Sequence, residues 1–125
     1  MLAAILQSGD PERLYTALSL LVSAAAEGTP ARGLVTFGAL EALLADDVAA
    51  ADAPHVVAAE REPFARTLAE LRATAAELED CRLWACAAAV AATGANPQVI
   101  AARLDGVMST PRFLREVAGA QLVVV

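Results

Sequence analysis

Short, largely apolar runs alternate along this chain with longer segments that carry the period of an α-helix. A run that is apolar at successive positions is typical of a strand buried on both faces of a sheet. Such strands need helices above and below them, and a helix between two strands makes those strands parallel. We therefore predict an α/β fold, a three-layer α/β/α sandwich around a mostly parallel five-stranded sheet. The expected strands are residues 2–6, 33–38, 82–85, 107–108 and 122–125.

The helical segments carry recognisable start and stop signals. Asp10 can cap a helix that has Pro11 at its first position, and Gly28 follows the last turn of that helix. The other expected helices cover residues 39–44, 64–78, 87–93, 97–103 and 110–119. Residues 45–62 are irregular in character, so we expect a long loop there.

Length and composition bound the class of protein. The chain has 125 residues, enough for a single domain over 1–125, and 58% of them are hydrophobic. Alanine supplies 32 residues and Trp only one, which favours closely packed elements over disorder. The longest uncharged stretch, residues 83–102, is interrupted by Gly94 and Pro97, so no membrane span is expected. We also read no signal peptide at the amino terminus, because it lacks a basic region.

The charges and the motifs of the sequence exclude several classes of partner and of reaction. All nine basic residues are Arg, and fifteen carboxylates bring the net charge to -6, so nucleic acid is a poor candidate partner. Neither a glycine-rich nucleotide motif nor the motifs of serine hydrolases and zinc proteases occur. We therefore expect no cofactor and no metal.

The chain has two cysteines, Cys81 and Cys86. Their spacing matches no common zinc motif, and two cysteines are too few for a disulfide framework in a domain of this size. A strand of about five residues would hold their Cα atoms roughly 16 Å apart, too far for a disulfide. A reduced, cytoplasmic location fits this pattern best.

The carboxyl ends of parallel strands meet at one edge of a sheet, which is the usual position of a site in such folds. The candidate site residues at that edge are Ser8, Gly9, Asp10, Phe37, Gly38, Cys86, Ala87, Ser109 and Thr110. Amide groups at a helix start after Ser8 and Asp10 could hold a small anion such as a sulfur oxyanion or phosphate. The alternative is that Ser8, Asp10, Ser109 and Thr110 only cap helices, which we favour.

Cys86 is the strongest candidate for chemistry. At the end of a strand and the start of a helix, a thiolate is stabilised by free amide groups and by the helix dipole. Such a thiolate can accept a sulfane sulfur as a persulfide and pass it on without a metal or an organic cofactor. The alternative is that Cys86 packs as a small hydrophobe among alanines. Cys81 precedes the third expected strand, at the opposite edge, and is expected to be structural.

Four segments together resemble the DsrE/DsrF-like family: SGDPER at 8–13, VTFG at 35–38, LWACAA at 83–88, and DGV with the later FLR and LVVV at 105–125. The resemblance implies a three-layer α/β/α fold and assembly into trimers or hexamers. In the sulfur-relay branch of that family one cysteine carries a persulfide, and Cys86 matches it by its place after the third strand. The resemblance thus implies a persulfide carrier or sulfurtransferase that works with a sulfur donor or acceptor protein.

A second hypothesis uses the same fold without covalent chemistry, as a small-anion-binding or assembly module. Residues 87–92 have no charged face, so we expect them to be buried against the sheet or against another subunit. A homo-oligomer is expected under either hypothesis.

The remaining candidates are charged: His55, the acidic residues Asp46, Asp47 and Asp52, and Arg112 with Arg115. His55 could act as a general base if the long loop folds over the site, although a lone loop histidine is more often incidental. The acidic residues could hold a hard cation but are more typical of a solvated patch. The two arginines could bind an anion, and an ordinary surface role is the favoured reading.

Overall fold

The computed structural model describes residues 1–47 and 53–125. The described residues form one sheet of five parallel strands in the order β4-β3-β2-β1-β5. The strands are β1 (Leu2–Leu6), β2 (Ala31–Val35), β3 (Cys81–Cys86), β4 (Val107–Met108) and β5 (Gln121–Val124). The helices are α1 (Pro11–Ala26), α2 (Phe37–Leu44), the short 3-10 helix η1 (Ala58–Glu60), α3 (Arg61–Glu77), α4 (Ala87–Thr93), α5 (Pro97–Arg103) and α6 (Thr110–Glu116). The predicted α/β sandwich with its parallel five-stranded sheet is confirmed.

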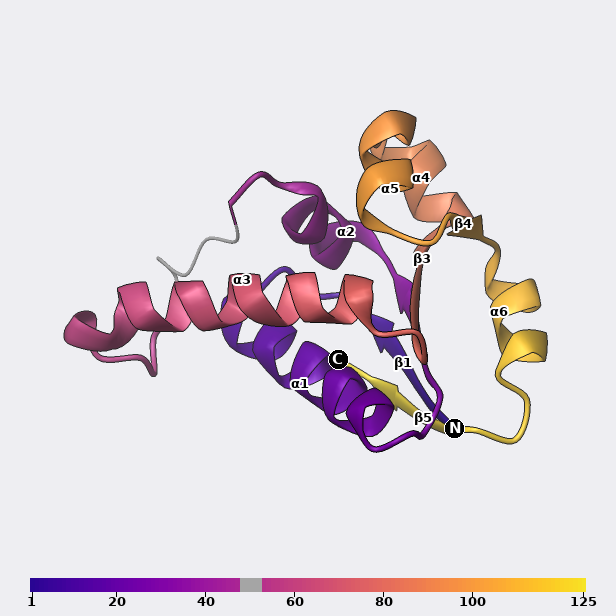
Figure 1. The fold of residues 1–125 in the computed structure, drawn as a ribbon. Helices are drawn as coiled ribbons and strands as arrows, with labels where there is room; N and C mark the ends of the chain where they lie inside the picture. Colours follow the sequence, from indigo (N-terminus) through magenta and orange to yellow (C-terminus); the bar gives the residue numbers. More distant parts are fainter. Residues whose placement is uncertain (48–52) are drawn as a thin grey trace.

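Two neighbouring residues of β3 show how the layers form, because successive side chains of a strand point to opposite faces of the sheet. The ring of Trp84 lies edge-on to Phe113 of α6, with 6.4 Å between the ring centres. On the other face, Leu83 lies close to Gly33 of β2, where Leu21 of α1 also packs. Figure 1 shows α1 and α3 side by side along one face of the sheet, with α6 on the other side.

Gly33 in the middle of β2 makes room for this packing. A Cβ at Gly33 would lie 2.5 Å from Cδ2 of Leu83, and 3.3 and 3.4 Å from Cδ1 of Leu6 and of Leu21. Leucines from two strands and a helix therefore fill the space that a side chain on β2 would occupy. The fully buried large side chains include Leu6, Leu14, Leu18, Leu21, Leu34, Leu40, Leu43, Leu68 and Phe113.

The boundary between β2 and α2 differs from the prediction. The strand was expected over residues 33–38 but ends at Val35, and Phe37 and Gly38 form the first turn of α2. The amide and the hydroxyl of Thr36 both donate to the carbonyl of Leu6, over 2.8 and 3.2 Å. The carbonyl of Thr36 in turn accepts from the amides of Ala39 and Leu40, so the helix begins two residues earlier than the glycine suggests.

The region predicted as a loop over residues 45–62 is partly helical. After η1, α3 begins at Arg61, with Pro63 in its first turn, where a missing amide hydrogen costs no helical hydrogen bond. Residues 48–52, with Asp52, lie outside the described part of the chain.

Strand β3 is also longer than predicted. Cys81 is its first residue, paired with Ala31, and does not precede the strand as expected. At the carboxyl end of the chain, α6 ends at Glu116 and β5 begins at Gln121. No helix in the described part of the chain is long and apolar enough to cross a membrane.

Candidate functional site at the carboxyl edge of the sheet

The first four strands end side by side, as their register shows. Leu6 of β1 pairs with Val35 of β2, Val35 pairs with Ala85 of β3, and Cys86 pairs with Met108 of β4. The residues predicted for the site follow these strand ends by no more than a few positions. Figure 1 shows α2, α4 and α5 gathered at this end of the sheet. The structure therefore places the predicted residues along one edge, although it does not bring them all into one cavity.

Gly9 and Gly38 join the first two strand ends. A Cβ on Gly9 would lie 2.6 Å from the carbonyl oxygen of Gly38, closer than real Cβ atoms approach backbone. The amide of Ala39 donates to the carbonyl of Gln7 over 3.1 Å, which holds the two segments together. The two glycines are thus required by backbone packing between the start of α2 and the loop before α1.

Phe37 is an unusual first residue for α2. Its φ angle is +37°, in a region that glycine favours and that a bulky residue enters only with strain. Its side chain is 49% exposed, so burial of the ring does not account for the strain. The next residue, Gly38, is the one that packs against Gly9, so the strained angle of Phe37 lies directly beside this tight backbone contact. Phe37 was predicted at the site from its position alone, and no sequence pattern indicates this strain.

Cys86 ends β3 and immediately precedes α4, as predicted. The residue is 5% exposed, and its Sγ atom lies 4.0 Å from Oγ1 of Thr110, the first residue of α6. Thr110 itself is exposed, and Ala87, the first residue of α4, is half-buried. Cys86 is thus a free thiol just beneath the surface, with a hydroxyl group as its neighbour.

Cys81 lies at the opposite end of β3, at the amino edge of the sheet. Burial, and then the charge of Asp105, raise the pKa of the Cys81 thiol to about 11 against the opposing effects of Arg32 and Arg82. A thiol with this pKa is protonated near neutral pH and is a poor nucleophile. This contrast between the two ends of β3 agrees with the expectation that Cys81 is structural.

The hydroxyl and carboxylate groups of the predicted site act as helix caps. Oγ of Ser8 accepts a hydrogen bond from the amide of Asp10 over 3.1 Å, and Oδ2 of Asp10 accepts one from the amide of Arg13 over 2.9 Å. Oγ of Ser109 accepts from the amide of Arg112 over 3.3 Å. These contacts satisfy amide groups that an anion would otherwise use. The geometry thus shows capping by Asp10 and Ser109, whereas Ser8 bonds to the amide of the Asp10 cap and the hydroxyl of Thr110 lies against Cys86.

His55 lies against the start of α1. Its amide donates to Oε2 of Glu12 over 2.8 Å, and its Nδ1 lies 2.7 Å from Oε1 of the same carboxylate. The first of these contacts is the main cause that lowers the pKa of Glu12. Both residues line a hollow of about 590 Å³ together with Arg13, and Cys86 does not line it. Glu12 was not predicted from the sequence, because a contact between residues 43 positions apart leaves no local pattern.

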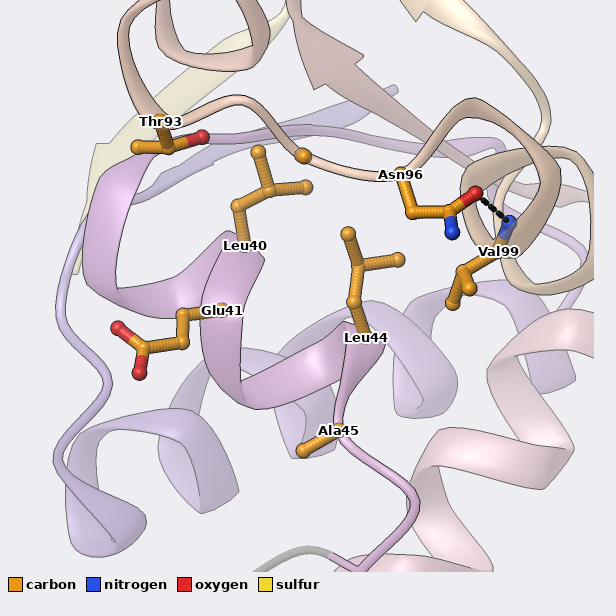
Figure 2. Close-up of a pocket in the computed structure, with 8 residues that line it drawn as sticks. Leu40, Glu41, Leu44, Ala45, Thr93, Asn96 and Val99 are labelled. Carbon is orange, nitrogen blue, oxygen red and sulfur yellow. Dashed lines mark hydrogen bonds between the residues drawn. The ribbon is translucent and has the colours of Figure 1, made fainter.

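A pocket of about 420 Å³ lies between α2 and the α4–α5 segment, beside the predicted site. Its lining residues are Leu40, Glu41, Leu44, Ala45, Thr93, Ala95, Asn96 and Val99. Figure 2 shows Leu40 and Leu44 in the middle of the pocket, Glu41 and Thr93 toward one end, and Asn96 with Val99 at the other. No sequence motif predicts these pocket residues, because the pocket forms only where α2 and α5 approach each other.

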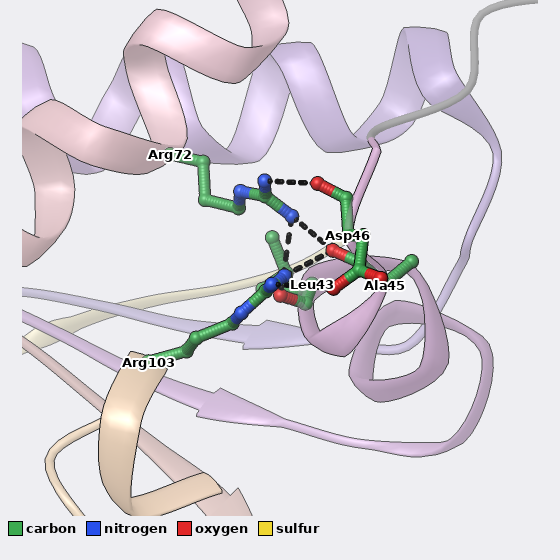
Figure 3. A network of polar contacts seen from close by, with 5 residues as sticks. All are labelled: Leu43, Ala45, Asp46, Arg72 and Arg103. Atoms are coloured by element: carbon green, nitrogen blue, oxygen red, sulfur yellow. Dashed lines mark hydrogen bonds and ion pairs between the residues drawn. The ribbon is translucent and has the colours of Figure 1, made fainter. Parts of the chain in front are cut away.

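Two arginines from distant elements converge on the end of α2, as Figure 3 shows. Arg72 of α3 donates to the carbonyls of Ala45 and Asp46 over 2.7 and 3.1 Å. Arg103 of α5 donates to the carbonyl of Ala45 and to Oδ1 of Asp46, the latter over 3.0 Å. Burial, and then the charge of Arg103, lower the pKa of Arg72. Arg72 also reaches the carbonyl of Leu43 in the last turn of α2, over 3.5 Å, so the two arginines hold the end of a helix that has no basic residue of its own there.

Of the acidic residues predicted as a candidate cation site, the structure describes Asp46 and Asp47. Asp46 pairs with Arg103, and Asp47 lines a separate hollow of about 320 Å³ with Gly9, Gly38 and Glu41. Within residues 1–47 and 53–125, no three His, Cys, Asp or Glu side chains are grouped to hold a metal ion.

Arg112 and Arg115, the other charged candidates, lie exposed on α6, in the helix that begins at Thr110.

The sequence matches no known protein-family profile and no curated protein. Among solved structures, the fold is similar to that of the ychN protein from E. coli, with a TM-score of 0.57 and 14% sequence identity. The match covers 98% of this chain and 96% of that chain. The two proteins therefore share the same overall fold along almost their whole length. At this identity the likeness is one of fold alone.

Proposed function

We propose that this chain is a DsrE-like protein of sulfur metabolism in which Cys86 accepts and donates a sulfane sulfur. The observation that carries the proposal is the place of Cys86 at the carboxyl end of β3, the third of four neighbouring strand ends. The contrast with Cys81 supports it, because the raised pKa of Cys81 makes that thiol a poor competitor.

The proposed reaction is a nucleophilic exchange that needs no cofactor. The Cys86 thiolate attacks the outer sulfur of a donor such as thiosulfate, and the S–S bond of the donor breaks as sulfite leaves with its electron pair. Cys86 then carries a persulfide. A thiolate of an acceptor protein attacks the outer sulfur in turn and releases the Cys86 thiolate. A donor or acceptor protein in a reducing, cytoplasmic compartment is part of this proposal.

Thr110 has a positioning role in this proposal. Its hydroxyl lies 4.0 Å from Sγ of Cys86 and can donate a hydrogen bond that orients the sulfur for attack. We expect Thr110→Val to slow sulfur loading severalfold while the fold stays intact. Thr67→Val is the matched control, because Thr67 is also exposed near a helix start and its hydroxyl donates to the carbonyl of Pro63.

Mass spectrometry of the intact protein after exposure to thiosulfate tests the proposal. Wild type and Cys81→Ala are expected to gain one sulfur atom, and Cys86→Ala is expected to gain none. Reduction with a thiol should remove the added mass. A gain that persists in Cys86→Ala and disappears in Cys81→Ala overturns the assignment.

A binding or assembly module without covalent chemistry is the second candidate. The burial of Cys86 and the capping contacts of Ser8, Asp10 and Ser109 favour it. Under this candidate a small alkylating reagent reacts with Cys86 as slowly as with Cys81 at neutral pH. Under the sulfur-transfer proposal Cys86 reacts much faster than Cys81.

Assembly with copies of the same chain is proposed under both candidates. One face of α4 packs through Ala89, but Ala88, Ala91 and Ala92 are exposed in the single chain. Edge strand β5 likewise exposes Leu122 and Val124. Sedimentation of the dilute protein tests this proposal, and a clean monomer contradicts it.

A further inference from the structure

The pocket between α2 and α5 is built as a small-molecule site rather than as a gap in packing. Its volume of about 420 Å³ lies in the range of small-ligand pockets. Leu40, Leu44 and Val99 give it an apolar middle, and polar groups stand at its two ends (Figure 2). An apolar body with a few placed polar groups is the usual composition of a ligand site.

The walls of the pocket are fixed before any ligand arrives. Arg72 and Arg103 hold the backbone at Ala45 and Asp46, where the α2 wall ends. On the facing wall, Asn96 caps α5, and its Oδ1 accepts from the amides of Gln98 and Val99 over 2.8 and 3.4 Å. A pocket braced on both sides loses little conformational entropy when a ligand binds.

The two ends of the pocket offer different chemistry. At one end, the cap uses only Oδ1 of Asn96, and Figure 2 shows the Nδ2 amide nitrogen turned toward Leu44 and Val99, where it can donate to a ligand. At the other end lies Glu41, an exposed residue that also borders the hollow formed with Gly9, Gly38 and Asp47, and its side chain extends away from Leu44 in Figure 2. None of the four ion pairs among the described residues involves Glu41.

We propose that this pocket binds an aliphatic primary amine whose far end carries a hydrogen-bond acceptor. The ammonium group pairs with Glu41, the alkyl chain covers Leu40 and Leu44, and the acceptor receives the hydrogen bond from Asn96. The guanidinium groups nearest the pocket already bond to carbonyls and to Asp46, so Glu41 is the charge left for a ligand. The pocket lacks Cys86 and goes beyond the proposed sulfur transfer.

Titration with 6-aminohexanamide, followed by backbone NMR shifts and calorimetry, tests the site. We expect saturable shifts at Leu44, Asn96 and Val99. Hexanamide, which lacks the ammonium group, and hexylamine, which lacks the acceptor, should each bind about fivefold or more weakly, because each leaves one polar contact unmade. Equal binding of all three compounds, or no saturable shift at these residues, overturns the proposal.

Two variants test separately whether binding needs the charge of Glu41 and whether it needs the open volume of the pocket. Glu41→Gln should weaken 6-aminohexanamide about fivefold and leave hexanamide unchanged, since only the first carries a charge. The matched control is Glu116→Gln on α6, an exposed glutamate that does not line the pocket, and it should change neither. Val99→Trp should fill the pocket and abolish binding, with circular dichroism as the check on folding.

Amine binding at this pocket is expected to be independent of sulfur transfer at Cys86. Cys86→Ala should bind 6-aminohexanamide as wild type does, and Glu41→Gln should gain sulfur from thiosulfate as wild type does. Loss of amine binding in Cys86→Ala contradicts the separation of the two sites.

Discussion

The backbone of Gly9 packs directly against the backbone of Gly38, so that a Cβ on Gly9 would stand 2.6 Å from the Gly38 carbonyl oxygen. This contact joins the loop after β1 to the first turn of α2, two segments that both border the candidate site. A carbonyl oxygen held in a helix start cannot move aside as the end of a flexible side chain can. The geometry of the site edge therefore depends on the absence of a side chain at Gly9.

Gly9→Ala is expected to destabilise the protein by about 2 kcal/mol, because the new methyl group overpacks against backbone. Urea unfolding of both proteins measures the change. Gly28→Ala is the matched control: Gly28 has a φ of +84° and nothing within 4 Å of its Cβ position. It should cost only about 1 kcal/mol for the left-handed backbone. A loss for Gly9→Ala no larger than for Gly28→Ala would show that the contact is not tight.

We predict that Arg103 stabilises the protein more through its hydrogen bond to the carbonyl of Ala45 than through its ion pair with Asp46. Arg103→Met keeps the apolar stem and removes the donors, so we expect a loss of about 1–2 kcal/mol in unfolding experiments. Asp46→Asn should change stability little, because the carboxylate of Asp46 is fully exposed. Arg66→Met, which breaks an exposed pair with Glu62, is the control for removing a surface arginine. Equal effects of Asp46→Asn and Arg103→Met would contradict the carbonyl role.

The pKa of Cys81 predicts a loss of stability in base. Burial raises this pKa from an ordinary 9.0 to about 11, so folding favours the neutral thiol. The contribution is complete below pH 9 and is lost as the pH rises toward 11, by about 2–3 kcal/mol in all. Unfolding at pH 8 and pH 10.5 should show a steeper loss for wild type than for Cys81→Ala. Parallel losses in the two proteins would contradict the raised pKa.

The contact between Glu12 and His55 predicts a response at the acid end. Hydrogen bonds from His55 lower the pKa of Glu12 below its ordinary 4.5. The carboxylate therefore contributes stability above that value, and the contribution is lost as the pH falls through the lowered pKa. We expect wild type to be more stable than Glu12→Gln at pH 6, with a smaller difference at pH 3. A difference that does not change between the two pH values would show that the charge of Glu12 plays no part.

The features predicted from the sequence are those with a local cause. The Asp10–Pro11 start of α1 and the place of Cys86 at the end of β3 follow from capping chemistry and from the alternation of strands and helices. The features that were missed arise where distant segments meet. The cap of α2 comes from Arg72 and Arg103, and the pocket exists only between α2 and α5. No local sequence pattern predicts contacts between such distant segments.

The start of α2 was predicted at the wrong residue, and the backbone strain at Phe37 can be tested by mutation. Its φ of +37° favours glycine, and both Phe37→Gly and Phe37→Ala lose the same ring. In an ordinary helix position Ala is more stable than Gly by about 0.5–1 kcal/mol. At residue 37 we expect the opposite order, with Phe37→Gly more stable than Phe37→Ala by about 1 kcal/mol, because only glycine adopts the angle without strain. Urea unfolding of the two variants decides the sign, and Ala88→Gly in α4 should give the ordinary order. If Phe37→Ala proves the more stable, the backbone at residue 37 relaxes on mutation, and the contact between Gly9 and Gly38 does not fix it.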